Sequence, residues 1–151
     1  MDLKVIELDD YDLPLLEELV RIQAETFGEL GLNKGTLPMF IKYGRVFLLA
    51  RDREIIGSAE LMKDWKDARS AFLVGFCIKK EERRKGLGKF FLQQITDRIS
   101  RDIDKVELTV APCNQAALNV YRQAGFEESG HLRDVYGAGE DRLLLTLTLT
   151  E

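Results

Sequence analysis

The sequence predicts an α/β fold of the α+β kind, in a single domain over residues 1–151. Three observations lead to this prediction. The chain has 151 residues, which is enough for one substantial apolar core. No linker, repeat or low-complexity tract divides it. Segments with strand-like patterning also alternate with segments of helical spacing, in the order strand, two helices, three strands, helix, strand, helix and two strands.

The N-terminal half is expected to contain two helices and four strands. The first helix is amphipathic, and Pro14 fits its first turn, where a missing N–H costs little. A short second helix is expected at residues 37–43. The apolar positions at helical spacing in the first helix are Leu16, Leu19, Val20 and Phe27. The strands are expected at residues 4–8, 45–51, 55–63 and 70–78, with a tight turn at Arg53 and Glu54 between the second and the third.

The C-terminal half is expected to contain two further helices and three strands. The helices are expected at residues 86–100 and 115–124. The strands are expected at residues 105–110, from about 126 onward, and at 142–150. The last strand alternates leucines with Thr146, Thr148 and Thr150, a period of two with one polar face.

Composition narrows the classes of function. The net charge of −4 argues against general nucleic-acid binding. No apolar run approaches 18 residues, and the acidic N-terminus lacks the pattern of a signal peptide. Cys77 and Cys113 indicate no disulfide framework. We therefore expect a cytoplasmic protein with no membrane, nucleic-acid or metal partner, and the sequence leaves a homodimer open.

A basic, glycine-containing loop precedes the third helix. Glycines allow the backbone to turn, so that successive N–H groups converge on an anion, and the helix N-terminus favours negative charge. A pyrophosphate is the natural ligand. A dinucleotide-binding motif would need glycine where Phe91 stands, and a Walker loop would need Ser or Thr in place of Phe90. The loop residues are Arg83, Arg84, Lys85, Gly86, Leu87, Gly88 and Lys89.

A second motif lies on the last helix. Asn114 is placed to cap this helix, and Ala117 and Tyr121 are four residues apart on one face. Gly125 occupies the position of a C-terminal cap glycine, and Phe126 returns the chain to the core.

The two motifs together resemble motifs A and B of the GNAT superfamily of N-acetyltransferases, specifically from about Phe72 to Phe126. The resemblance implies the single-domain GNAT fold, with a mixed, mostly antiparallel central sheet and helices on both faces. It also implies an enzyme that moves an acetyl group from acetyl-CoA to a primary amine, by direct attack of the amine on the thioester. The acceptor would be a small-molecule or peptide amine.

The resemblance also implies roles for individual residues. Tyr121 would be the catalytic acid that protonates the departing thiolate. Apart from the resemblance, Cys77 is expected to be inert packing rather than a nucleophile, because no histidine is near it in the sequence and a buried strand cysteine is usually inert. The cofactor-binding residues implied are Phe76, Cys77 and Ile78 through their backbone, Arg83, Arg84, Lys85, Gly86, Leu87, Gly88 and Lys89 in the loop, and Asn114 and Ala117 on the last helix.

The family pattern is not met at the general base. Two positions that carry glutamate in relatives hold Thr109 and Phe72 here. The base is left open among Glu60, Glu107, His131 and a chain of waters. We expect that neither Glu60 nor Glu107 is indispensable, because water would relay the proton.

Two other functions are weighed against the enzyme. A non-catalytic acyl-CoA-binding or sensing module would explain the missing glutamates, but the intact Tyr121 disfavours it. A nucleic-acid-binding protein would use residues 79–85, where Glu81 and Glu82 interrupt the basic run.

Overall fold

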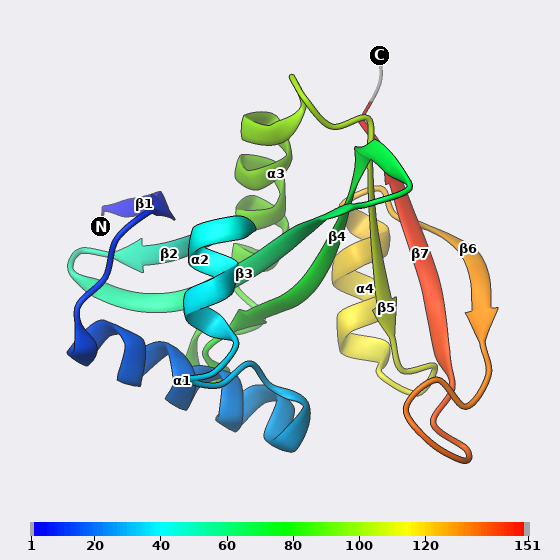
Figure 1. Cartoon of the computed structure of the whole chain (residues 1–151), viewed down its shortest axis with the longest axis horizontal. Helices are drawn as coiled ribbons and strands as arrows, with labels where there is room; N and C mark the ends of the chain where they lie inside the picture. Colours follow the sequence, from blue (N-terminus) through cyan, green and yellow to red (C-terminus); the bar gives the residue numbers. More distant parts are fainter. Residues whose placement is uncertain (1, 150–151) are drawn as a thin grey trace. The chain divides into compact units, whose positions relative to one another are not determined.

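The computed structural model describes residues 2–149, and its elements follow the expected order (Figure 1). Two short 3-10 turns, η1 (Gly28–Leu30) and η2 (Lys80–Glu82), are additional. The helices are α1 (Leu13–Phe27), α2 (Leu37–Tyr43), α3 (Leu87–Ile99) and α4 (Gln115–Gln123). The strands are β1 (Leu3–Leu8), β2 (Arg45–Arg51), β3 (Glu54–Asp64), β4 (Asp67–Ile78), β5 (Lys105–Val110), β6 (Glu127–Leu132) and β7 (Arg142–Thr148).

The seven strands hydrogen-bond in the order β1-β2-β3-β4-β5-β7-β6. The pairing of β4 with β5 is parallel, whereas β1–β2, β2–β3, β5–β7 and β6–β7 are antiparallel. The prediction of a mixed, mostly antiparallel sheet is therefore confirmed. The chain forms two compact units: unit 1 is Met1–Met62 with Leu73–Phe91, and unit 2 is Lys63–Phe72 with Leu92–Glu151. A single domain over residues 1–151 stays a prediction.

In unit 1, α1 and α2 pack on strands β1 and β2. Helix α1 begins after Asp12, whose Oδ1 accepts a hydrogen bond of 2.9 Å from Leu15 N, and Pro14 lies in its first turn as expected. Because side chains alternate along a strand, Val46 and Leu48 of β2 share the face that the helices cover. The buried cluster of this face is Leu8, Leu16, Leu19, Leu37, Ile41, Val46 and Leu48.

In unit 2, β7 lies between β5 and β6 (Figure 1). The expected alternation of the last strand is seen, because Leu143 and Leu145 are buried. The part of the prediction that covers Thr150 lies outside the described residues. At the start of β4, Arg69 forms a two-bond ion pair with Asp104, with both nitrogen–oxygen distances 2.8 Å.

Some boundaries differ from those expected. Strand β4 begins at Asp67 rather than at residue 70, because the hairpin before it is closed by a tight turn at residues 65–66. Helix α3 begins at Leu87, one residue after the glycine that turns the chain. None of the helices in residues 2–149 combines the length and the apolar character that a membrane span requires.

Candidate active site

The basic loop has the backbone conformation that its glycines predict. Gly86 has a φ of +78°, a conformation that glycine adopts without steric cost, and no atom lies within 4 Å of where its Cβ would be. Arg84 also has a positive φ, of 65°. Phe90 N donates to Gly86 O at 3.2 Å, so the first turn of α3 closes directly on this glycine. The chain therefore turns sharply into a helix N-terminus, as an anion-binding loop does.

Three side-chain interactions fix this loop within unit 1. Arg83 Nε donates to the carbonyl oxygen of Ile78 at 2.9 Å, which ties the loop to the end of β4. Arg51 pairs with Glu82 at 2.6 Å, and this guanidinium holds the pKa of the Glu82 carboxyl below its usual value. Lys85 Nζ lies 3.2 Å from the same Glu82 oxygen, so Glu82 partly neutralises the positive charge of Lys85.

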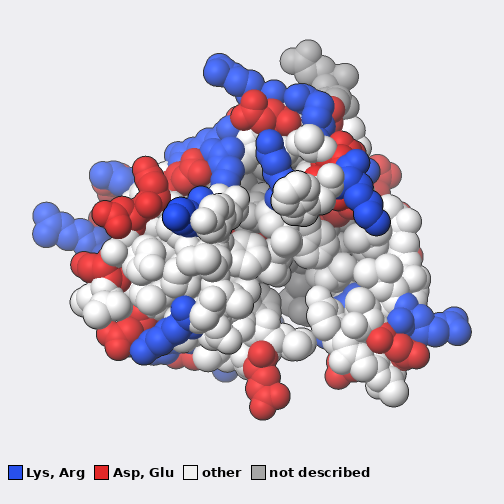
Figure 2. All heavy atoms as spheres, viewed as in Figure 1, with Lys and Arg blue, Asp and Glu red and all other residues white. Residues whose placement is uncertain are grey.

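Charge on the viewed face of the molecule is mixed. Figure 2 shows acidic and basic side chains interspersed there, without a large patch of one sign. The basic residues of the loop that lie on the surface include Arg84 and Lys89, which are both exposed.

The end of β4 leads directly into the loop. Phe76 packs on Phe91 of α3, with ring centroids 5.5 Å apart. Cys77 is buried, and its Sγ lies 3.4 Å from Ser58 Oγ. Burial raises the pKa of the Cys77 thiol, so at neutral pH it stays protonated and poorly nucleophilic. The parallel ladder with β5 ends at the pair Phe72 and Glu107, before this part of β4 begins.

A buried carboxyl group lies on the neighbouring strand of unit 1. Glu60 of β3 is 1% exposed, and its Oε1 accepts a hydrogen bond of 2.7 Å from Gln23 Nε2. Gln23 is also 1% exposed, and its Oε1 accepts from Leu32 N at 3.1 Å. Burial raises the pKa of Glu60 from 4.5 to about 7, although hydrogen bonds from Ser58 and Gln23 oppose the rise.

The second motif lies in unit 2. Asn114 Oδ1 accepts from Ala117 N at 3.2 Å, so Asn114 caps α4. Tyr121 is half-buried, and its ring meets that of Phe126 edge to face at 5.7 Å. Gly125 has a φ of +102°, which suits the end of the helix. The structure thus brings Asn114, Ala117 and Tyr121 together in one unit and the loop with the end of β4 in the other.

The other two candidates for the general base lie in unit 2. Glu107 is half-buried on β5. His131 is exposed, and its Nε2 lies 2.7 Å from Asp141 Oδ2, an interaction that lowers the pKa of Asp141. Asp141 Oδ1 accepts from Asp134 N at 2.9 Å, so this pair fastens the segment between β6 and β7.

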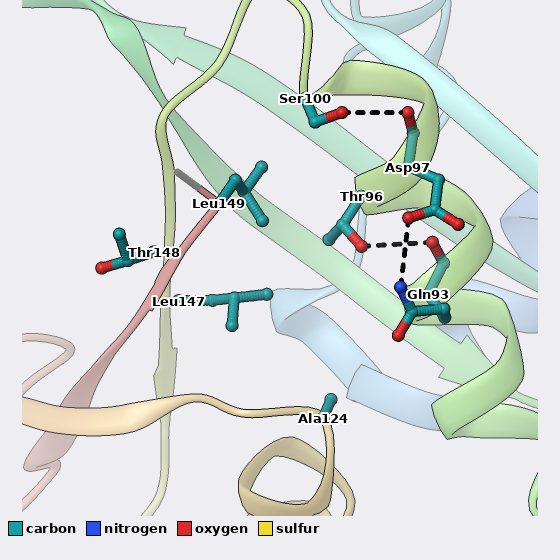
Figure 3. Close-up of a pocket in the computed structure, with 8 residues that line it drawn as sticks. All are labelled: Gln93, Thr96, Asp97, Ser100, Ala124, Leu147, Thr148 and Leu149. Atoms are coloured by element: carbon teal, nitrogen blue, oxygen red, sulfur yellow. Dashed lines mark hydrogen bonds between the residues drawn. The ribbon is translucent and has the colours of Figure 1, made fainter. Parts of the chain in front are cut away.

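A hollow of unit 2 is lined by residues of α3 and β7, with Ala124 and Leu149 (Figure 3). Its polar groups bond to one another along α3: Gln93 Nε2 donates to Asp97 Oδ1 at 3.1 Å, and Thr96 and Ser100 donate to helix carbonyls. Among residues 2–149, no cluster of three or more His, Cys, Asp or Glu side chains could hold a metal ion.

Comparison with known proteins gives a family. Residues 14–126 match the acetyltransferase (GNAT) family. The chain is 27% identical over 120 residues to an N-alpha-acetyltransferase of Sulfurisphaera tokodaii. This match covers 72% of each chain.

Solved structures show the same fold. A GNAT-family acetyltransferase of Streptococcus pneumoniae is 22% identical, with a TM-score of 0.83 over 99% of this chain and 100% of that one. A GNAT-family acetyltransferase of Elizabethkingia anophelis with acetyl-CoA bound is 15% identical, with a TM-score of 0.76 over 97% of each chain.

Proposed function

We propose how this chain, which belongs to the GNAT acetyltransferase family and is an N-acetyltransferase that uses acetyl-CoA, carries out its reaction. Its acceptor is a primary amine, and the amine attacks the thioester directly. The acceptor is a small molecule or a peptide, and the proposed place of action is the cytoplasm. Peptide N-termini are the first acceptors to try, because the relative from Sulfurisphaera tokodaii is an N-alpha-acetyltransferase.

The loop of unit 1 carries this proposal. Its positive-φ glycine, Gly86, opens α3 directly after β4, and the Arg83–Ile78 hydrogen bond holds the loop to the strand. Backbone N–H groups at the start of α3 would bind the pyrophosphate, and the exposed Arg84 and Lys89 would add positive charge. The backbone of residues 76–78 would bond the pantetheine arm and the acetyl carbonyl.

The chemistry that we propose needs no covalent enzyme intermediate. The amine nitrogen attacks the thioester carbon, the C–N bond forms, and the C–S bond breaks from a tetrahedral intermediate. Tyr121 would protonate the departing thiolate, and the ordinary pKa of a thiol is near 8.5. The raised pKa of the buried Cys77 supports direct transfer, because an acyl-enzyme would need a thiolate there.

A screen of amines tests this function. The protein is incubated with acetyl-CoA and one amine at a time: an Ala-initiated and a Ser-initiated peptide, free amino acids, polyamines and aminoglycosides. The expected result is amine-dependent release of CoA thiol, with an acetylated amine found by mass spectrometry. Tight acetyl-CoA binding without transfer to any of these amines would instead identify a non-catalytic acyl-CoA-binding module.

A further inference from the structure

The hydrogen-bonded pair Gln23–Glu60 lies on one particular face of unit 1. Glu60 is directly opposite Val46 in the β2–β3 pairing, and opposed residues of an antiparallel pair point to the same face. Val46 belongs to the cluster that α1 and α2 cover. Glu60 therefore points toward the two N-terminal helices, and Gln23 of α1 meets it there.

The carboxyl group lies directly over the backbone of β4. A Cβ on Gly75 would overlap Glu60 Oε1 and would lie 3.5 Å from Gln23 Nε2. A glycine at this position thus creates the space that the carboxyl occupies. Gly75 immediately precedes residues 76–78, whose backbone is assigned above to the acetyl end of the cofactor.

The opposite side of β4 faces the cofactor loop. Because side chains alternate along a strand, Phe76 points away from the face of Gly75, and it packs on Phe91 of α3. The basic loop opens this same helix. A cofactor held by the loop therefore reaches the end of β4 from the α3 side, whereas Glu60 stands on the side of α1 and α2.

We propose that Glu60 is the proton acceptor of the acetyl transfer, and that Gln23 positions it. This inference rests on the proposed function and replaces the expected water relay. The acceptor arrives as an ammonium and gives one proton to a carboxylate oxygen of Glu60, directly or through one water, and Glu60 later releases it to solvent. The amine then forms the C–N bond, and the C–S bond breaks from the tetrahedral intermediate. Tyr121, as proposed above, donates its proton to the departing CoA sulfur, and the second proton of the amine restores the phenol.

The raised pKa of Glu60 supports this role. A general base works best when its pKa lies near the working pH, and burial brings this carboxyl to about 7. The groups that face Glu60 from the neighbouring elements are Gln23 of α1, Ser58 of its own strand and Cys77 of β4. None of these three carries a charge at neutral pH, so burial is the main cause of the rise.

The test is the pH dependence of kcat with two saturating acceptors, an Ala-initiated peptide and an alkyl amine. Their amino groups have ordinary pKa values of about 8 and about 10.4. The ascending limb should lie at the same pH for both, since it reports Glu60. Glu60→Gln should lower kcat by about 100-fold or more and abolish this limb, with acetyl-CoA affinity unchanged. Glu107→Gln is the matched control and should leave kcat and the limb as in the parent.

Ser58→Ala gives a second readout that does not depend on the folding of Glu60→Gln. The hydroxyl of Ser58 lowers the pKa of Glu60, so removing this hydroxyl should move the ascending limb to higher pH. A structural role for Glu60 would leave that limb in place, and this result would overturn the proposal. A limb that follows the amine, or full activity in folded Glu60→Gln, would also overturn it while leaving the proposed function intact. No transfer by the parent protein to any amine would remove both.

Discussion

Arg51 Nη1 lies 2.6 Å from Glu82 Oε1, and this ion pair joins the end of β2 to the turn that precedes the basic loop. Both side chains are mostly buried, with 17% and 11% of their surfaces exposed. Glu82 also holds Lys85, so one carboxylate restrains two positions around the loop. The shape of the proposed phosphate-binding loop thus depends on a residue of a strand far away in the sequence.

Replacing Arg51 with methionine should weaken acetyl-CoA binding severalfold, because the loop loses this restraint. The ion pair depresses the pKa of Glu82 below 4.5, so its stabilising effect is present above that pH and is lost as the pH falls through the depressed value. Arg51→Met should therefore be less stable than the parent at pH 7, and this difference should shrink as the pH falls through the depressed pKa of Glu82. Calorimetric titration with acetyl-CoA and urea unfolding measure the two effects. Arg69→Met, which breaks the exposed pair with Asp104, is the control and should keep its acetyl-CoA affinity.

Replacing Gly86 with valine should lower acetyl-CoA affinity by at least about tenfold. A left-handed backbone costs other residues about 1–2 kcal/mol, so the loop would strain or rearrange its N–H groups. Gly139 is a matched control, because its φ is +77° and its surroundings are equally open. Gly139→Val should lose similar stability but bind acetyl-CoA as the parent does. Equal affinity in both variants would show that the loop does not bind the cofactor.

The buried state of Glu60 predicts an unusual stability profile. A carboxyl whose folded pKa is raised from 4.5 to about 7 stabilises the fold fully below pH 4.5, and this contribution is lost as the pH rises through 7. The difference corresponds to roughly 3 kcal/mol. Glu60→Gln should therefore be more stable than the parent at pH 8 by an amount of this order, and the advantage should shrink toward pH 4.5. Urea unfolding across this range measures it, and a difference independent of pH would contradict the account.

Replacing Tyr121 with phenylalanine should slow the chemical step by about 10- to 100-fold. The ring would keep its edge-to-face contact with Phe126, so folding and acetyl-CoA affinity should persist. Tyr43→Phe is the control, because Tyr43 is 75% exposed on α2. Single-turnover rates measure this step, with the protein in excess over the amine and acetyl-CoA at a saturating concentration. An undiminished rate would mean that Tyr121 only packs.

Replacing Cys77 with alanine should leave turnover within about twofold of the parent. The thiol is buried and protonated, so its loss removes packing and the contact with Ser58, at a cost on the order of 1 kcal/mol. Turnover with the accepted amine and thermal unfolding check both points. Loss of turnover in a folded, acetyl-CoA-binding variant would indicate a nucleophilic role.

Much of the fold could be predicted because local signals agreed with the tertiary structure. Helix α2 and strands β2 and β5 have the expected boundaries, and turn residues or glycine flank each of them. The start of β4 could not be predicted, because Asp67 and Arg69 carry no strand-like alternation and are ordered by their neighbours, as in the Arg69–Asp104 pair.

The burial of Glu60 was only weakly visible in the sequence. Glu60 stands in a strand whose positions 56–61 are all buried, and Gln23 falls on the apolar stripe of α1 with Leu16 and Leu19. Two polar residues at core positions are a signal that they meet. Which residues meet depends on strand register and on the glycine at position 75, and neither follows from periodicity.

In the proposed reaction, the amine attacks the thioester while both substrates are bound to the protein. Initial rates across a matrix of acetyl-CoA and amine concentrations, with the acceptor that the screen identifies, test this most directly. The double-reciprocal lines should intersect, because both substrates must be present before CoA leaves. Parallel lines, the pattern of an acetyl-enzyme intermediate, would contradict it.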